Sequence, residues 1–175
     1  MLFRSPALPV EPLSQGFIWL GCVRTAFEAQ RHEIQAWLQA WTGGALVDLH
    51  VSDLLNPQLP SHFDDTSWYD LLVFRRLAAA NGQVSEATQT PHALSAIDTS
   101  PVGFAVFDRV LLTVHPSDCQ VREYFAQRLT QHAQDSDVRG SHRLPTSPAE
   151  LMLRMVNHMV DSYLDLRRLL TRHFA

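Results

Sequence analysis

The sequence predicts a mixed α/β (α+β) fold in which helices pack against a mixed β-sheet. Short apolar runs typical of buried strands occupy residues 17–23, 102–107 and 110–114. Longer segments carry apolar residues at helical spacing, most clearly over 147–175. Because each apolar face has to be covered by another element, a sheet with helices packed against it is the economical architecture.

Composition limits the classes of function. The chain has 175 residues, 46% of them hydrophobic, and a formal net charge of −4. This length suits one domain with its own core, or one domain plus an appendage. The negative charge argues against nucleic acid as a partner. All 14 basic residues are arginine, which excludes mechanisms that need a P-loop, Schiff-base or kinase-type lysine.

The sequence carries no signal for membrane insertion or secretion. Its longest apolar run, residues 16–23, is far shorter than the roughly 20 residues of a membrane helix. The N-terminus is rich in proline and lacks the apolar core of a signal peptide. The two cysteines, Cys22 and Cys119, form neither a disulfide framework nor a zinc motif, so a reducing cytosolic setting fits best.

Local patterns predict the elements of the first part of the chain. Residues 1–14 are expected to form a disordered, Pro-rich arm. A buried strand is predicted at 17–23 and a helix at 25–41. The helix begins with a capping box formed by Thr25 and Glu28. A glycine pair after residue 42 ends that helix.

Residues 45–55 suit one or two helical turns. The Asn-Pro pair that follows them ends the helix. Residues 68–77 predict a long strand and 79–100 a long loop. The two apolar runs at 102–107 and 110–114 predict a β-hairpin around an Asp-Arg turn. The four tryptophans are expected to anchor the core; they are Trp19, Trp37, Trp41 and Trp68.

The last part of the chain predicts two helices separated by a polar loop at 134–146. The first helix begins at Asp118. The second begins with a cap at Ser147, a first-turn proline and a capping-box glutamate at Glu150. Its apolar stripe still runs close to Ala175 without a stop signal, so we expect a truncated long helix. The stripe includes the methionines at 152, 155 and 159, whose spacing favours packing over a cofactor site.

Few side chains suggest a site. None of the nine histidines forms an i, i+4 pair or an HExxH motif. His50 and Asp53, at i, i+3, share a helical face and form either a turn interaction or, less often, a ligand pair. Cys119 at a helix start suits a thiolate, but a small buried hydrophobe is the more common case. Two exposed acidic pairs in expected loops suit solvated turns better than a Mg²⁺ site; they are Asp64-Asp65 and Asp135/Asp137.

Four stretches carry a resemblance through their order and spacing. They are residues 17–20 (FIWL), 50–56 (HVSDLLN) with 69–74 (YDLLVF), 102–114 (VGFAVFDRVLLTV) and 149–170, in which MVNHMVDSY occupies 155–163. Together they resemble the cytoplasmic N-terminal domain of CorA-type divalent-cation transporters, a family that includes related zinc transporters. The resemblance covers about residues 17–170. Ser52 and Asn157 stand where the family has acidic residues, and the Gly-Met-Asn sequence and two membrane helices of the family are absent.

The resemblance implies an αβα sandwich over residues 15–146, followed at 147–175 by the truncated start of a helical stalk. It implies a homopentamer on the cytoplasmic face of the inner membrane, with membrane contact only through C-terminal helices missing here. It further implies that Mg²⁺, or Co²⁺ or Zn²⁺, is both transported and regulatory, binding between neighbouring cytoplasmic domains to hold the pore closed. No enzyme activity, catalytic residue or organic cofactor is implied.

One site residue follows from the resemblance. Asp53 matches the acidic ligand of the inter-subunit regulatory site, and its partner is expected on the stalk beyond Ala175. His50, with Asp48, would make a softer site that suits Zn²⁺ or Co²⁺. Two alternatives remain open at this stage. One is a stand-alone interaction module that uses the apolar stripe of residues 151–170; the other, less favoured, is a small metal-dependent hydrolase.

Overall fold

The computed structural model describes residues 16–79, 97–134 and 143–174, so the predicted arm at 1–14 lies outside the described residues. The elements follow in chain order as β1 (Ile18–Val23), α1 (Arg24–Ala29), α2 (Arg31–Thr42), α3 (Asp48–Leu55), β2 (His62–Asp65), β3 (Asp70–Arg75), β4 (Ala78–Ala79), β5 (Ile97–Asp98), β6 (Pro101–Val106), β7 (Val110–His115), α4 (Gln120–Gln134) and α5 (Pro148–Phe174).

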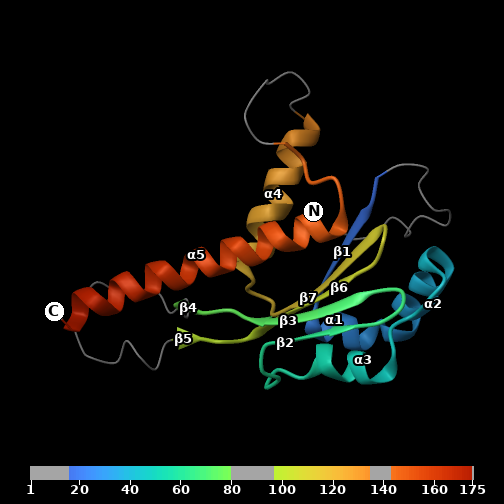
Figure 1. The fold of residues 1–175 in the computed structure, drawn as a ribbon, viewed down its shortest axis with the longest axis horizontal. Coiled ribbons are helices and arrows are strands. Elements are labelled where there is room, and N and C mark those ends of the chain that lie inside the picture. The colour runs from blue at the N-terminus through green and yellow to red at the C-terminus, as the bar shows by residue number, and fades with distance from the viewer. Residues whose placement is uncertain (1–15, 80–96, 135–142, 175) are drawn as a thin grey trace.

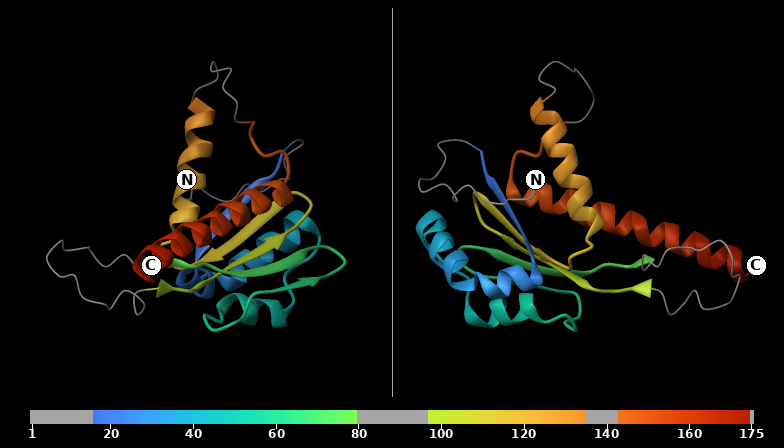
Figure 2. Two further views of the ribbon diagram at one scale, coloured as in Figure 1. Left: turned by 60° about the vertical axis from the view of Figure 1, so that its left-hand side comes forward. Right: turned by 180° about the vertical axis from the view of Figure 1, so that it is seen from behind.

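One mixed sheet organises the fold. Its strand order is β1-β7-β6-β3-β2, with β1 parallel to β7 and every other neighbouring pair antiparallel (Figure 1). Helices α1, α2 and α3 cover one face of this sheet, and α4 and α5 cover the other (Figure 2). The expected αβα sandwich with a mixed sheet and a long last helix is therefore confirmed.

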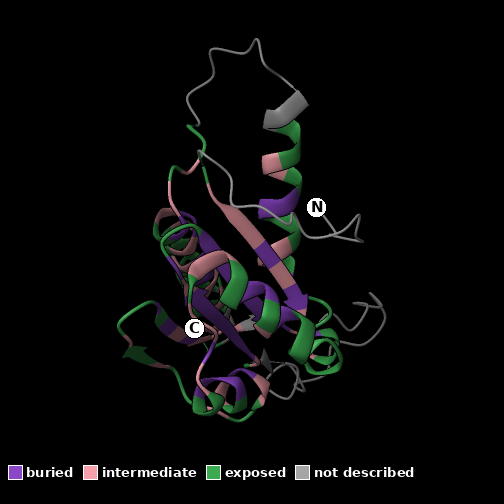
Figure 3. Cartoon of the chain, turned by 90° about the vertical axis from the view of Figure 1, so that its right-hand side faces the viewer, coloured by how far each residue is buried: buried purple, intermediate pink, exposed green. Residues whose placement is uncertain are grey.

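Two hydrophobic clusters lie on the two faces of the sheet. On β6 and β7, 11 of the 12 residues are buried, because both faces of these central strands are covered. Alternate residues point to opposite clusters, so that Leu112 packs with α1–α3 and Leu111 packs with α4 and α5. Figure 3 shows this burial along the strands and on the helix faces that meet them. The predicted hairpin at 102–114 is confirmed.

The single helix expected at 25–41 is wrong in detail. Two helices occupy the segment, and they are separated at Gln30, whose N–H donates to Ala26 O at 2.9 Å. The expected capping box does not form, because β1 runs directly into α1 and Thr25 already lies inside the helix, with Val23 as its N-cap. The predicted end of the helix at the glycine pair is confirmed, since Gly43 ends α2 in the left-handed conformation at φ 78°.

The segment between α3 and the hairpin also differs from expectation. Asp64 and Asp65, predicted in a loop, belong to the edge strand β2. The strand expected at 68–77 is shorter, and Trp68 is 43% exposed instead of anchoring the core. The two ends of the loop expected at 79–100 belong to short strands, β4 and β5, which pair with each other. Residues 80–96 between them lie outside the described residues.

Helix α3, which carries two predicted site residues, packs very closely on the sheet. Leu54 lies directly over Gly103 of β6, where an added Cβ would overlap Leu54 Cδ2. His50, Val51 and Leu54 form its buried side. The neighbouring side of α3 meets the edge strand β2.

The final helix is confirmed at Pro148–Phe174, and the first part of its apolar stripe packs against the sheet. Leu151, Met155 and Met159 are buried against the sheet. The interaction-module alternative therefore cannot use the whole stripe. Among the side chains of α5 that the structure describes, the exposed large hydrophobic ones are Leu153, Val160, Leu164 and Phe174.

The cap of α5 forms with one change of partner. Ser147 Oγ accepts from Glu150 N–H at 3.1 Å, as a capping box requires. Glu150 Oε2 accepts from the N–H and the hydroxyl of Thr146, one residue earlier than expected, at 2.8 and 2.7 Å. Hydrogen bonds from Thr146, with a further one from Arg154, lower the pKa of Glu150 to about 2.

This lowered pKa predicts a pH-dependent contribution to stability. The pKa of Glu150 is lower in the folded chain than its ordinary value of 4.5. Its contribution is therefore complete above pH 4.5 and is lost as the pH falls towards about 2. We expect Glu150→Gln to lower the melting temperature at pH 7 and to have little effect near pH 2. Glu28→Gln, an exposed control in α1, should change neither value; an equal loss for Glu150→Gln at both pH values would contradict this assignment.

Candidate functional site

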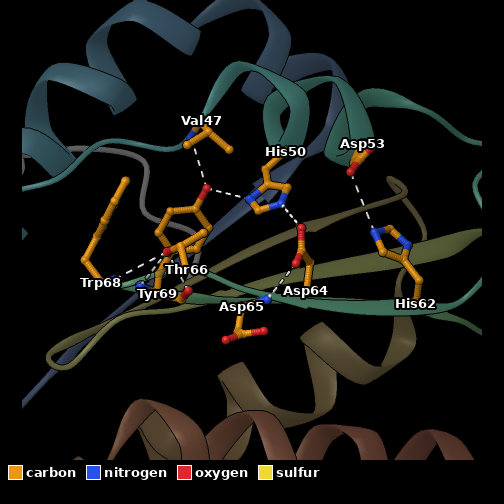
Figure 4. Close-up of polar contacts among 9 residues, drawn as sticks. All are labelled: Val47, His50, Asp53, His62, Asp64, Asp65, Thr66, Trp68 and Tyr69. Carbon is orange, nitrogen blue, oxygen red and sulfur yellow. Dashed lines mark hydrogen bonds and ion pairs between the residues drawn. The ribbon is translucent and has the colours of Figure 1, made fainter.

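The two site residues predicted on α3 both face the edge strand β2 (Figure 4). His50 contacts Asp64, and Asp53 lies opposite His62. On the helix the two side chains are three residues apart, and on the strand their partners are two residues apart, so each pair lies on one face of its element. His50 and Asp53 therefore share a face as expected, but each one interacts with a different residue of β2.

His50 is the centre of a buried hydrogen-bond network. Its side chain is 2% exposed. A carboxylate only accepts hydrogen bonds, so His50 Nε2–H donates to Asp64 Oδ2 at 2.8 Å. In the neutral imidazole, Nδ1 then accepts from the Tyr69 hydroxyl at 2.6 Å. Tyr69 Oη accepts in turn from Val47 N–H at 3.0 Å, so the Tyr69 hydroxyl and both ring nitrogens of His50 have partners.

The network shifts the acidity of its members. The hydrogen bond from His50 is the largest cause that lowers the pKa of Asp64, and the N–H of Asp65 adds to the same effect. Burial raises the pKa of Tyr69, which keeps its hydroxyl protonated as a donor to His50. The network connects α3, β2 and the start of β3, and both ring nitrogens of His50 are engaged within the chain.

Asp53 and His62 form a more open pair at the end of α3. Asp53 Oδ2 lies 3.6 Å from His62 Nε2, and their side chains are 18% and 31% exposed. The separation is too long for an N–H···O hydrogen bond. His62 is oriented from its other side, because Nδ1 lies 3.3 Å from Pro60 O. A carboxylate oxygen and an imidazole nitrogen thus face each other at an accessible position.

The segment that carries this pair is acidic in sequence. Residues 48–70 contain five aspartates and no arginine. Asp48 and Ser52 are exposed on α3, and Asp65 and Asp70 are exposed on β2 and β3. Asp65 points away from α3, because it follows Asp64 along the strand (Figure 4). Arg75 of β3, however, donates to Pro57 O and Leu59 O, so a guanidinium group lies against the loop that joins Asp53 to His62. Among the described residues, no group of three or more His, Cys, Asp or Glu side chains could by itself hold a metal ion.

Other candidate positions contribute less. A pocket of about 440 Å³ lies between α4 and α5. Its lining contains two residues that could serve as metal ligands of a hydrolase, His158 and Asp161. The hydrolase alternative needs three converging ligands, so this pocket does not support it.

Burial raises the pKa of the Cys119 thiol, which contradicts the thiolate interpretation and agrees with a small buried side chain. Asp135 and Asp137 lie outside the described residues.

His62 and Asp64 were not found as site residues from the sequence alone. Their strand was not predicted, because the segment is polar and its one large apolar residue, Phe63, is 62% exposed. A signal did exist in the spacing of the two residues. In an extended strand, residues 62 and 64 point to the same face. The His-x-Asp sequence at 62–64 therefore indicated two side chains on one face of a strand, as the i, i+3 spacing indicated for His50 and Asp53 on a helix.

Comparison with solved structures identifies proteins of the same fold. The CorA magnesium transporter from Methanocaldococcus jannaschii matches 89% of this chain with a TM-score of 0.55 and 12% identity, over 41% of its own length. The full-length CmaX protein matches 94% with a TM-score of 0.56 and 16% identity, over 42% of its length. The ZntB cytoplasmic domain from Vibrio parahaemolyticus matches 94% with a TM-score of 0.53 and 17% identity, over 57% of its length.

These matches confirm, at the level of the fold, the resemblance to CorA-like cytoplasmic domains. The chain spans between 41% and 57% of the length of the three proteins. No model of a protein family and no curated protein matches the chain. Within the part of the chain that the structure describes, no helix combines the length and the apolar character needed to cross a membrane.

Proposed function

We propose that this chain is the regulatory cytoplasmic domain of a CorA-like divalent-cation transporter, with Mg²⁺, Co²⁺ or Zn²⁺ as the transported and regulatory ion. The observation that carries the proposal is the fold match, which extends over about nine-tenths of the chain for both CorA and ZntB. The domain itself carries out no catalysis. In the whole protein it lies on the cytoplasmic face of the inner membrane.

Asp53 is the proposed contribution of this chain to a site shared between copies. Its carboxylate is partly exposed at the end of α3, in a segment, residues 48–70, that contains five aspartates. Two copies that bring such surfaces together repel each other, and a divalent cation between them offsets the repulsion. Loss of the ion then weakens the closed assembly, so the ion concentration regulates the pore.

Self-association follows from the same proposal, with a homopentamer as the state of the whole transporter. The contacts that the resemblance assigns to the stalk and membrane helices are missing here. We therefore expect this chain alone to be a monomer or a weak oligomer. Light scattering with and without millimolar Mg²⁺ measures this directly, and a stable pentamer without added metal would contradict the expectation.

The decisive test is cation flux through the whole transporter, reconstituted in liposomes, as a function of Mg²⁺ on the cytoplasmic side. We expect wild-type flux to fall as Mg²⁺ rises into the millimolar range. Asp53→Asn should remain active while losing at least half of this inhibition, because a ligand of the closed state is gone.

Asp48→Asn is the matched control, because it removes the same charge from the exposed first turn of the same helix. It should keep the inhibition. The absence of cation flux in the wild type, or equal behaviour of Asp53→Asn and wild type, would overturn the proposal. Equal loss in both variants would show a general charge effect and would overturn the specific role of Asp53.

A further inference from the structure

The pocket of about 440 Å³ between α4 and α5 has the size of a site for a small molecule. Its walls come from α4, from the first half of α5 and from residues 143–145, which precede α5. It lies on the face of the sheet that α4 and α5 cover, whereas α3 with Asp53 covers the other face (Figure 2). The pocket is therefore separate from the proposed cation site.

Positive charge converges on this pocket. Helix α5 packs against the sheet through apolar side chains such as Leu151 and Met155. The side chains that face the pocket are of a different kind and include three arginines, Arg128, Arg143 and Arg154. Space between packed elements is normally filled by side chains of the protein itself. Several cations around one cavity repel each other unless negative charge lies between them.

The carboxylate beside these arginines offsets only part of their charge. Glu150 Oε1 accepts from Arg154 Nη2 at 2.6 Å, and Arg154 Nη1 donates to Arg143 O at 2.6 Å. The Arg143 side chain is 76% exposed and lies 3.6 Å from the same carboxylate oxygen. Within the described ranges, Arg128 has no carboxylate partner, and its Nη1 donates to the Tyr124 hydroxyl. Uncompensated positive charge thus remains at the pocket.

The other part of the wall is aromatic and apolar. The ring of His158 stacks on Tyr124 with the ring centroids 4.4 Å apart, and Phe125 meets His158 edge-on at 5.8 Å. Leu129 and Leu144 extend this wall. Because the rings hold one another in place, the wall is preorganised for a flat apolar group.

The two parts of the wall together select a class of ligand. Guanidinium groups bind phosphate through pairs of N–H donors. A phosphate group carries about −1.5 to −2 charge and three acceptor oxygens, so it can accept from two arginines at once. A carboxylate has one charge and two oxygens. An inorganic ion would leave the aromatic wall uncovered, so the ligand needs a ring as well as an anionic group.

We propose that this pocket binds a small molecule in which a phosphate group is attached to a planar ring system, as in a nucleoside monophosphate. Arg128 and Arg143 bind the phosphate group. The ring system lies against the wall that Tyr124, Phe125 and His158 form.

The test is isothermal titration of the 175-residue chain at pH 7 with AMP and, separately, with adenosine and with inorganic phosphate. We expect AMP to bind roughly tenfold or more tightly than either of its parts, because only AMP engages both the arginines and the aromatic wall. The ring resonances of Tyr124 and His158 in NMR spectra should shift on addition of AMP. Absence of AMP binding up to millimolar concentration would overturn the proposal, as would equal affinity for AMP and for either part.

Two substitutions with opposite expected signs locate the site. Arg128→Gln should weaken AMP binding roughly tenfold, because a charge-assisted contact with phosphate is lost. Asp161→Asn removes the one carboxylate of the lining and should strengthen AMP binding about twofold or more, because it removes a repulsion. An unfolded variant cannot bind more tightly, so Asp161→Asn tests the proposal even if Arg128→Gln fails to fold.

Arg167→Gln is the matched control, because it removes an exposed arginine of α5 that does not line the pocket. It should keep the affinity for AMP within about twofold of wild type, since exposed charges at a distance are screened by salt. An unchanged affinity in Arg128→Gln, an equal loss in Arg167→Gln or weaker binding by Asp161→Asn would each show that the pocket is not a phosphate site.

Discussion

Phe104→Ala is expected to lower the free energy of unfolding by about 3–5 kcal/mol, the usual cost of removing a fully buried phenylalanine ring. Phe104 is 1% exposed at the centre of β6 and packs in the cluster formed with α4 and α5. The surrounding strands are hydrogen-bonded on both sides and relax little, so a cavity remains. Urea denaturation monitored by circular dichroism measures the change.

Phe63→Ala is the matched control for this prediction. The same ring is removed from the edge strand β2, where it is 62% exposed. We expect a change within about 0.5 kcal/mol, as for most surface substitutions. If the two variants lost similar stability, α4 and α5 would not form the second hydrophobic layer that the structure describes.

The second large effect is expected for His50→Ala, at about 2–4 kcal/mol. The substitution removes a buried ring and leaves the Tyr69 hydroxyl without its acceptor. It also removes the donor to Asp64, so the pKa of Asp64 should rise towards its ordinary value of 3.8. Chemical denaturation gives the first quantity, and NMR titration of the Asp64 carboxyl carbon gives the second.

The pKa measurement separates the hydrogen-bond network from packing. A loss of stability with no rise in the Asp64 pKa would show that His50 only fills space. His32→Ala, on the exposed surface of α2, is the control and should change neither quantity. Since both ring nitrogens of His50 are engaged within the chain, we assign this residue a structural role that positions α3 against β2.

Apolar periodicity was sufficient for the central elements of the fold. The runs at 102–107 and 110–114 are covered on both faces of the sheet, so all their residues except Gly103 and Thr113 are large apolar residues or alanine, and the pattern was unambiguous. The last helix was equally clear, because its cap at Ser147 and its apolar stripe agree. These signals are local, and they remain readable without knowledge of the partners.

Tertiary structure decided the elements whose stability comes from distant partners. β2 is an exposed edge strand of polar residues that forms because β3 pairs with it, so it carries no hydrophobic signal of its own. The failed cap at Thr25 likewise results from the way β1 leads directly into α1, which makes Val23 the N-cap.

The same distinction applies to the candidate site. The sequence by itself determined that Asp53 and His50 share one face of a short helix, because helical spacing is a local property. It did not determine their partners, His62 and Asp64, which come from a strand that only the sheet defines. A functional site assembled from two elements depends on the contacts between them, and those contacts exist only in the folded chain.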